Sequence, residues 1–307
     1  MELPATICGC ALAFNVLAAK QPQKVFRVAG YLPEYRVDGI GPEQVEGLTD
    51  LIVFSVSPRN DGSLDASAWP KRRLDKARIL ATKTKARLLL AVGGWGRSAG
   101  FASMAGKAQS RQRFLKELAD LCGTNGFGGV IYDWEFPRTP KEEASFDHLL
   151  RDTRLLFSPK GRTVEIAVNP ARPLPRDWTV NVDAVHVMSY DNGPHHATYE
   201  QAVTDLNAMA KLGVPSEKQL LGLPFYGRSM TNRGNTKTYA EIKERFHPKR
   251  DQDEAGGFYF NGPDTLVKKV KLAKEHGLSG VMIWEIGQDA KGKDSLLSTL
   301  RAHAKNP

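Results

Sequence analysis

Eight short apolar runs alternate with helical stretches from residue 26 onward, and this alternation limits the fold most strongly. The runs cover residues 27–31, 51–56, 87–92, 129–134, 164–168, 184–189, 220–223 and 280–284. Several are almost entirely apolar, as strands buried on both faces should be. Alternating strands and helices predict a parallel sheet. Eight strands in about 260 residues favour a closed α/β fold, the (β/α)8 TIM barrel, over an open sheet.

Helical periodicity fills the gaps between these runs. One apolar stripe runs through residues 109–122 and a similar one through residues 198–212. The longest gap, 228–280, contains a basic helical segment over 239–246 and a second helical segment over 264–275. We expect its first part, about residues 229–262, to be a short excursion between strands 7 and 8 that is too small for a separate domain. Residues 21–307 then form one barrel.

The first 20 residues differ from the rest. A short apolar stretch, 10–19, ends in small residues before Lys20, as a secretory signal does. Glu2 stands where such a signal is usually positive, and Asn15 interrupts the apolar part. We expect a signal peptide that is removed on export, with a disordered start as the alternative. This favours a secreted or cell-envelope protein without excluding the cytoplasm.

Charge and cysteine content do not indicate a nucleic-acid partner, a metal site or a disulfide framework. The net charge of +9 is spread along the chain, and both Lys71-Arg72-Arg73 and Lys268-Lys269 fall in helical patterns where we expect solvated faces. This distribution does not favour a nucleic-acid partner. No apolar run approaches the roughly eighteen residues of a membrane span. The three cysteines define no metal site or disulfide framework, and we expect a soluble monomer.

Two carboxylates lie at the end of the fourth predicted strand, in the segment 128–137, GGVIYDWEFP. Asp133 and Glu135 are two residues apart, so a strand would aim both at the same space, with Ile131 beneath them. Neighbouring like charges raise the proton affinity of at least one carboxylate, which makes an acid available near neutral pH. In a barrel, the C-terminal ends of the strands are where catalysis occurs. The pair therefore predicts an acid catalyst.

Four strand ends, in the right order, resemble those of glycoside hydrolase family 18, the chitinase and chitinase-like group. Residues 130–135, VIYDWE, are similar to the second half of the family's D-G-x-D-x-D-x-E signature, and 91–95, AVGGW, resemble its S-x-G-G strand. Residues 188–191, MSYD, match M-x-Y-D, and 280–284, GVMIW, match the final strand with its tryptophan. Weaker matches are AGY at 29–31 and GLPFYG at 222–227. The resemblance extends from residue 26 to about residue 300.

The resemblance implies a role for each matched residue. Glu135 corresponds to the general acid that protonates the leaving oxygen. In this family the substrate's own acetamido group attacks the sugar carbon, so no enzymatic nucleophile, metal or cofactor is needed. Asp133 would orient and stabilise that acetamide, and the Tyr190 hydroxyl would bond its oxygen. Trp284 would form an apolar floor under the sugar, and further substrate contacts would be Asp191, Trp95, Tyr31, Met188 and Tyr226.

This chemistry requires a 2-acetamido group, which points to β-1,4-linked N-acetylglucosamine polymers or oligomers such as chitin. Peptidoglycan and N-glycan cores share that requirement and remain alternatives. A non-catalytic chitin-binding lectin is a different class, although such relatives commonly lose the acid that this chain keeps at Glu135. Glu285 is a rival carboxylate, and we expect it on the surface because its neighbour Trp284 would face the interior.

Three positions depart from the family pattern. Ile131 replaces the aspartate two residues before Asp133, Ala91 replaces the serine of S-x-G-G, and Gly128 replaces the first aspartate of the signature. A buried, unpartnered aspartate costs several kcal/mol, on the order of 2–7 for a neutral polar group alone, so joint loss of both inner polar groups avoids that cost. We expect Asp133 to stay committed to Glu135 and the substrate. Slower substrate turnover, or activity over a narrower pH range, than in family members with the full signature would follow.

Overall fold

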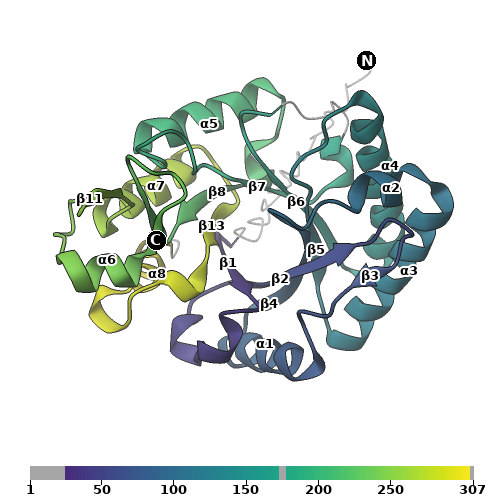
Figure 1. The fold of residues 1–307 in the computed structure, drawn as a ribbon, viewed down its shortest axis with the longest axis horizontal. Coiled ribbons are helices and arrows are strands. Elements are labelled where there is room, and N and C mark those ends of the chain that lie inside the picture. The colour runs from purple at the N-terminus through teal and green to yellow at the C-terminus, as the bar shows by residue number, and fades with distance from the viewer. Residues whose placement is uncertain (1–24, 173–177, 305–307) are drawn as a thin grey trace, which may run out of the picture.

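The computed structural model describes residues 25–172 and 178–304, which form a closed parallel barrel (Figure 1). The predicted segment 1–20, read as a signal peptide, lies outside these residues. The strand order is β1-β13-β8-β7-β6-β5-β4-β2, and pairing of β1 with β2 closes the ring. The (β/α)8 prediction is confirmed. The barrel strands are β1 (Arg27–Pro33), β2 (Asp50–Pro58), β4 (Arg87–Gly93), β5 (Gly129–Asp133), β6 (Thr163–Val168), β7 (Ala184–Val187), β8 (Gln219–Pro224) and β13 (Gly280–Trp284).

Helices surround the barrel, although two of its crossovers are irregular. The α-helices are α1 (Lys71–Thr84), α2 (Phe101–Gly106), α3 (Ala108–Asn125), α4 (Pro140–Phe157), α5 (Tyr199–Lys211), α6 (Tyr239–Phe246), α7 (Pro263–Glu275) and α8 (Leu296–Ala304). The β1–β2 crossover carries only the 3-10 turns Val37–Gly39 and Pro42–Gln44, and the described part of the β6–β7 crossover carries Trp178–Asn181. None of the helices in the described ranges is long and apolar enough to cross a membrane.

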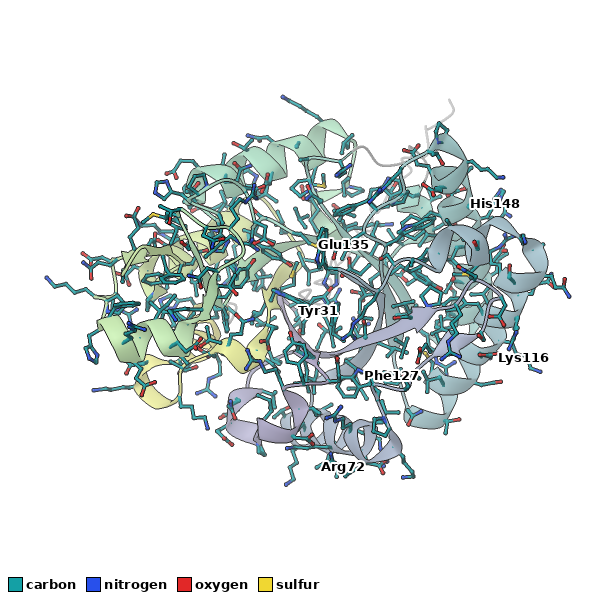
Figure 2. The ribbon with its side chains drawn as sticks, in the orientation of Figure 1. Tyr31, Arg72, Lys116, Phe127, Glu135 and His148 are labelled. Carbon is teal, nitrogen blue, oxygen red and sulfur yellow. The ribbon has the colours of Figure 1, made fainter. Side chains whose placement is uncertain are left out.

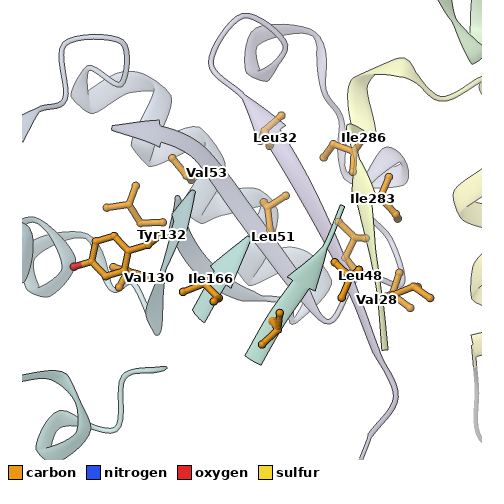
Figure 3. Close-up of a cluster of buried hydrophobic side chains, with 14 of the residues drawn as sticks. Val28, Leu32, Leu48, Leu51, Val53, Val130, Tyr132, Ile166, Ile283 and Ile286 are labelled. Atoms are coloured by element: carbon orange, nitrogen blue, oxygen red, sulfur yellow. The ribbon is translucent and has the colours of Figure 1, made fainter. Parts of the chain in front are cut away.

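Alternation along each strand divides the core into two layers. Val130 and Tyr132 on β5 belong to the larger cluster (Figure 3). That cluster also contains the apolar side chains that helices contribute. Ile131, one residue out of phase, belongs to a separate cluster with Tyr31, Leu89 and other side chains that fill the barrel interior. Because successive strand residues face opposite ways, Asp133 shares the inward direction of Ile131. The strand period therefore places the carboxylate at the barrel axis.

The predicted excursion after the seventh barrel strand folds as a small antiparallel sheet with a helix. Strands β9 (Tyr226–Ser229), β10 (Thr236–Thr238), β11 (Glu254–Ala255) and β12 (Phe258–Tyr259) pair in the order β10-β9-β12-β11. Thr238 caps α6, since its hydroxyl accepts from the Glu241 amide while the Glu241 carboxylate accepts from Thr238. Strand β9 follows β8 directly, so the excursion stands at the C-terminal rim of the barrel.

One basic pair is placed differently from the prediction. Lys71 and Arg72 are exposed, as expected, but the Lys269 side chain is fully buried. Lys269 lies three residues after Leu266 on the inner face of α7, and neighbours at that spacing share a helix face. Its ammonium group donates to the Ala197 carbonyl at 2.8 Å and to the Asn261 side chain at 2.9 Å. Burial lowers the pKa of Lys269 to about 7. The expectation of a solvated face was wrong for this residue.

Candidate active site

Asp133 and Glu135 line one cavity of about 300 Å³ at the C-terminal end of the barrel. Asp133 is the last residue of β5, and Glu135 lies two residues beyond the strand, in the turn that follows. Figure 2 shows Tyr31 and Glu135 near the middle of the barrel. The remaining lining side chains of this cavity, which we call the central cavity, are Tyr31, Tyr35, Phe54, Trp95, Arg97, Ala167, Met188, Tyr190, Asp191, Met282 and Trp284.

Two glycines bring the end of β4 against the carboxylate pair. Gly93 and Gly94 have φ of 96° and 106°, a region that favours glycine. The Gly94 amide donates to the Asp133 carbonyl at 2.7 Å. A Cβ on Gly93 would lie 2.4 Å from that same carbonyl oxygen. Close backbone approach therefore requires glycine at position 93, whereas a Cβ on Gly94 would lie 2.3 Å from the Phe54 ring.

Ser98 fixes the backbone between the two carboxylates, and the sequence pattern did not single it out. Its hydroxyl accepts from the Glu135 amide at 3.0 Å, and carbonyl oxygens of Asp133 and Gly94 each lie 3.2 Å from it as acceptors. One hydroxyl has a single proton to donate, so the two carbonyls share it. A serine three residues after the glycine-tryptophan unit carries no distinctive signal, because its partner lies 37 residues along the chain.

Both carboxyl groups hold protons more tightly than ordinary carboxylates. Burial and then the charge of Glu135 raise the pKa of Asp133 well above its usual value. Burial, followed by the charge of Asp191, raises the pKa of Glu135 to about 7. Asp133 Oδ1 is buried without a hydrogen-bond partner among the described residues. The pair can therefore hold a proton at neutral pH, as an acid catalyst must.

Aromatic side chains form the walls around the pair. Trp284 packs edge-on against Phe54 and Tyr31, with ring centroids 4.6 and 5.6 Å apart. The Tyr190 hydroxyl lies 3.9 Å from the Met282 sulfur, which is a weak acceptor, so that hydroxyl is available to a ligand. Met188 is half-buried and lines the same cavity. The structure thus brings together Asp133, Glu135, Tyr190 and the predicted apolar surface.

Asp191 stands at the rim, held by the excursion. Its carboxylate accepts from the Tyr226 hydroxyl and pairs with Arg228 at 2.6 Å, both from β9. Its backbone is left-handed, with φ of 66°. Tyr226 is buried and does not belong to the lining of the central cavity. Its position supports Asp191, and substrate contact by Tyr226 stays a prediction.

A second cavity, of about 530 Å³, also has Glu135 in its lining. It shares Trp95, Glu135 and Ala167 with the central cavity. We call it the outer cavity. Trp95 is 81% exposed, so its ring offers a free apolar face at the junction. The outer cavity is also lined by Trp134, Phe136, Pro137, Arg138, Glu143, Phe146, Val168, Asn169 and Arg172. Glu135 therefore belongs to the lining of both cavities.

Glu285 corrects one prediction. It is absent from the central cavity, as its outward direction implied, yet it is fully buried and not on the surface. Its carboxylate accepts from Arg36 Nε at 3.0 Å and from the Gly287 amide at 2.8 Å. The segment after β1 and the turn after β13 cover it, and such coverage cannot be deduced from strand alternation. Glu285 joins two loops and has no place in the site chemistry.

The floor of the site is apolar. Ala91 on β4 and Ile131 on β5 are register partners, and both are fully buried in the interior cluster. Two of the three departures from the family signature thus lie side by side beneath Asp133, as expected. Within residues 25–172 and 178–304, no group of three or more His, Cys, Asp or Glu side chains is arranged to hold a metal ion.

Comparison with known proteins identifies the family. The profile of "Glycosyl hydrolases family 18" matches residues 27–289. Endochitinase 1 of Metarhizium robertsii is 28% identical over 272 residues, which cover 69% of this chain and 64% of that protein. Chitotriosidase-1 of Mus musculus is 26% identical over 355 residues, covering 89% of this chain and 76% of that protein. The chain thus spans just under two thirds of the fungal enzyme's length.

Solved structures show the same fold. The GH18 chitinase ChiB from the chitin utilization locus of Flavobacterium johnsoniae has a TM-score of 0.81 at 24% identity, covering 92% of this chain and 94% of that one. A chitinase from Bacteroides thetaiotaomicron has a TM-score of 0.81 at 24% identity, covering 91% and 96%. The profile match spans most of the chain and includes all eight barrel strands. The chain therefore belongs to the glycosyl hydrolases of family 18 and is chitinase-like.

Proposed function

We propose that this protein hydrolyses β-1,4-linked N-acetylglucosamine polymers or oligomers by substrate-assisted catalysis with retention of configuration. The observation that carries the proposal is the position of Glu135. Glu135, with a pKa raised to about 7, lines both the central and the outer cavity. A saccharide that spans both cavities would place its glycosidic oxygen beside this acid.

The first chemical step breaks the glycosidic bond. The carbonyl oxygen of the substrate's 2-acetamido group attacks the anomeric carbon, and Glu135 gives its proton to the leaving oxygen. The positive charge that develops on the resulting oxazolinium ring is stabilised by Asp133, which must be ionised at this point. Tyr190, whose hydroxyl has only a weak sulfur partner, donates to the acetamido oxygen. The site therefore needs one proton shared by two carboxyl groups.

The second step restores the enzyme. Ionised Glu135 takes a proton from a water molecule, and the oxygen of that water attacks the anomeric carbon from the side the leaving group vacated. The bond to the acetamido oxygen breaks, which regenerates the acetamide. Each of the two steps inverts the configuration at the anomeric carbon, so the overall reaction retains it. Trp284 and Phe54, packed edge-on, supply the apolar surface on which the sugar ring rests during both steps.

The proposal is tested with a fluorogenic chito-oligosaccharide, with Glu135→Gln beside the unsubstituted protein. We expect Glu135→Gln to lower turnover at least about 100-fold, because general acid catalysis contributes that much. Glu275→Gln is the control, since Glu275 is exposed at the end of α7. Equal turnover in Glu135→Gln contradicts the acid role. Binding without turnover in the unsubstituted protein identifies a lectin.

A further inference from the structure

A buried hydrogen-bond chain runs along the inside of the barrel to the central cavity. Glu165 on β6 lies 2.8 Å from His186 Nε2, and His186 Nδ1 lies 3.0 Å from the Tyr31 hydroxyl. Glu165 and His186 are fully buried, and Tyr31 is 2% exposed. The residues matched to the family signature do not include Glu165 or His186. Tyr31 also lines the central cavity, together with Asp133.

Two arginines keep Glu165 ionised. Arg27 Nη2 donates to both carboxylate oxygens, at 3.1 and 2.9 Å, and Arg87 Nη2 donates at 3.0 Å. Although burial alone would raise it, the pKa of Glu165 is held far below its usual value by Arg27, His186 and Arg87. Glu165 is therefore an acceptor only. An ionised carboxylate 2.8 Å from a ring nitrogen requires a proton on that nitrogen, so His186 Nε2 carries one.

The state of His186 fixes the direction of the Tyr31 proton. Burial lowers the pKa of His186, even though Glu165 opposes this effect, so at pH 7 and above the ring is neutral and carries a single proton. With that proton on Nε2, Nδ1 can only accept. Tyr31 must then donate its one hydroxyl proton to His186. Besides Tyr31, the ionisable groups that act on His186 are Glu165, Arg27 and Asp50.

The direction of the Tyr31 hydroxyl proton affects Asp133. The charge of Asp133 acts on Tyr31 more strongly than that of any other ionisable group, which agrees with their facing the same cavity. Glu135 is the charged neighbour of Asp133 on its own segment, and Tyr190 faces it from the end of β7. Because Tyr31 has no second proton, it cannot donate to an ionised Asp133. Asp133 Oδ1 indeed has no donor among the described residues.

We propose that Glu165 and His186 are positioning residues, which hold the Tyr31 hydroxyl proton on the His186 side, so that Tyr31 presents its oxygen and not a proton to the central cavity that Asp133 also lines. In this arrangement the chain favours the neutral form of Asp133 and raises the pH at which Asp133 ionises. The effect of this chain on catalysis rests on the proposed function, because the proposed chemistry requires ionised Asp133. The hydrogen-bond arrangement itself does not depend on turnover.

The first measurement is ¹⁵N NMR of the histidine rings in the unsubstituted protein. We expect His186 to be neutral with the proton on Nε2 at pH 7 and above. A proton on Nδ1 overturns the proposal without any substitution. His186→Asn serves only to assign the resonance, so this test does not require a variant with full stability.

The second measurement is a ¹³C carboxyl NMR titration of the free protein, with the Asp133 resonance assigned by Asp133→Asn. His186→Leu removes the acceptor, so the Tyr31 proton can turn into the central cavity and favour the ionised form of Asp133. We expect the pKa of Asp133 to fall by up to about one unit, since an O–H dipole turned toward a carboxylate stabilises its charge. His148→Leu on the exposed face of α4 is the matched control and should cause no shift.

A double-substitution cycle separates this role from a structural one. In a Tyr31→Phe background, His186→Leu should leave the pKa of Asp133 unchanged, because no hydroxyl remains to turn. An equal shift in both backgrounds, or no shift in either, overturns the proposal. The titration reads Asp133 directly, so it distinguishes failure of this inference from failure of the proposed hydrolysis. If the protein hydrolyses chito-oligosaccharides, His186→Leu should also move the acid limb of kcat to lower pH by a similar amount.

Discussion

Ala91 and Ile131 are register partners on β4 and β5, and together they make the barrel interior beneath Asp133 apolar. In the family signature both positions carry polar side chains. Here Asp133 has the carboxyl group of Glu135 above it and hydrocarbon below. The proton shared by Asp133 and Glu135 therefore lacks the inner polar partners that the full signature would provide.

Restoring both polar groups should change the kinetics and reduce the stability. We predict that Ala91→Ser with Ile131→Asp raises kcat or widens its pH range, because Asp133 regains an inner partner. The free energy of unfolding should fall by about 2–4 kcal/mol, since a polar group replaces a buried apolar one. Ile131 is also the register partner of ionised Glu165, which adds repulsion. Ala91→Ser with Ile131→Asn is the control, because asparagine does not titrate. Unchanged turnover and pH profile in the first variant would contradict this account.

The strand period was enough to predict the barrel and the inward direction of Asp133, because both depend on local alternation. Strand ends were less accurate: β7 ends at Val187, two residues before the predicted end, and Trp134 lies outside β5. The burial of Lys269 and Glu285 and the role of Ser98 depend on partners from other elements. The Arg27–Glu165 contact joins residues 138 positions apart, which no local pattern reveals.

The close approach of Gly93 to Asp133 gives a stability prediction. Gly93→Ala adds a Cβ 2.4 Å from the Asp133 carbonyl oxygen at a left-handed φ, so both strain and a clash result. Gly96→Ala is the matched control, because Gly96 is also left-handed, with φ of 74°, but has nothing within 4 Å of the added atom. Urea unfolding should show a loss at least about 2 kcal/mol larger for Gly93→Ala. Equal losses would show that the clash is relieved.

The pKa of Glu135 sets the basic limb of the pH profile. Because burial and Asp191 raise this pKa to about 7, kcat/KM should fall as pH rises through about 7 and Glu135 loses its proton. Asp191→Asn removes the second cause, so the basic limb should move to lower pH by up to about one unit. The comparison uses the shape of the profile, since loss of Asp191 also affects binding. A basic limb that does not move would remove Asp191 from the electrostatics of Glu135.

Lys269 should make stability depend on pH in a defined window. Its folded pKa of about 7 lies below the unfolded value of 10.5. The unfolded state therefore binds more protons between these values, and the contribution of Lys269 to the free energy of unfolding rises with pH across them. Relative to Lys269→Met, the unsubstituted protein should gain on the order of a few kcal/mol between pH 6 and pH 10. Parallel stability curves for the two proteins would show that Lys269 is charged throughout.

The proposed mechanism is tested most directly by time-resolved ¹H NMR of a chito-oligosaccharide during hydrolysis, with the matching cello-oligosaccharide beside it. Substrate assistance predicts that the β-anomer of the new reducing end appears first and that the cello-oligosaccharide, which lacks the acetamido group, is not cleaved. Initial release of the α-anomer, or comparable cleavage of both substrates, would contradict the roles assigned to Asp133 and Glu135.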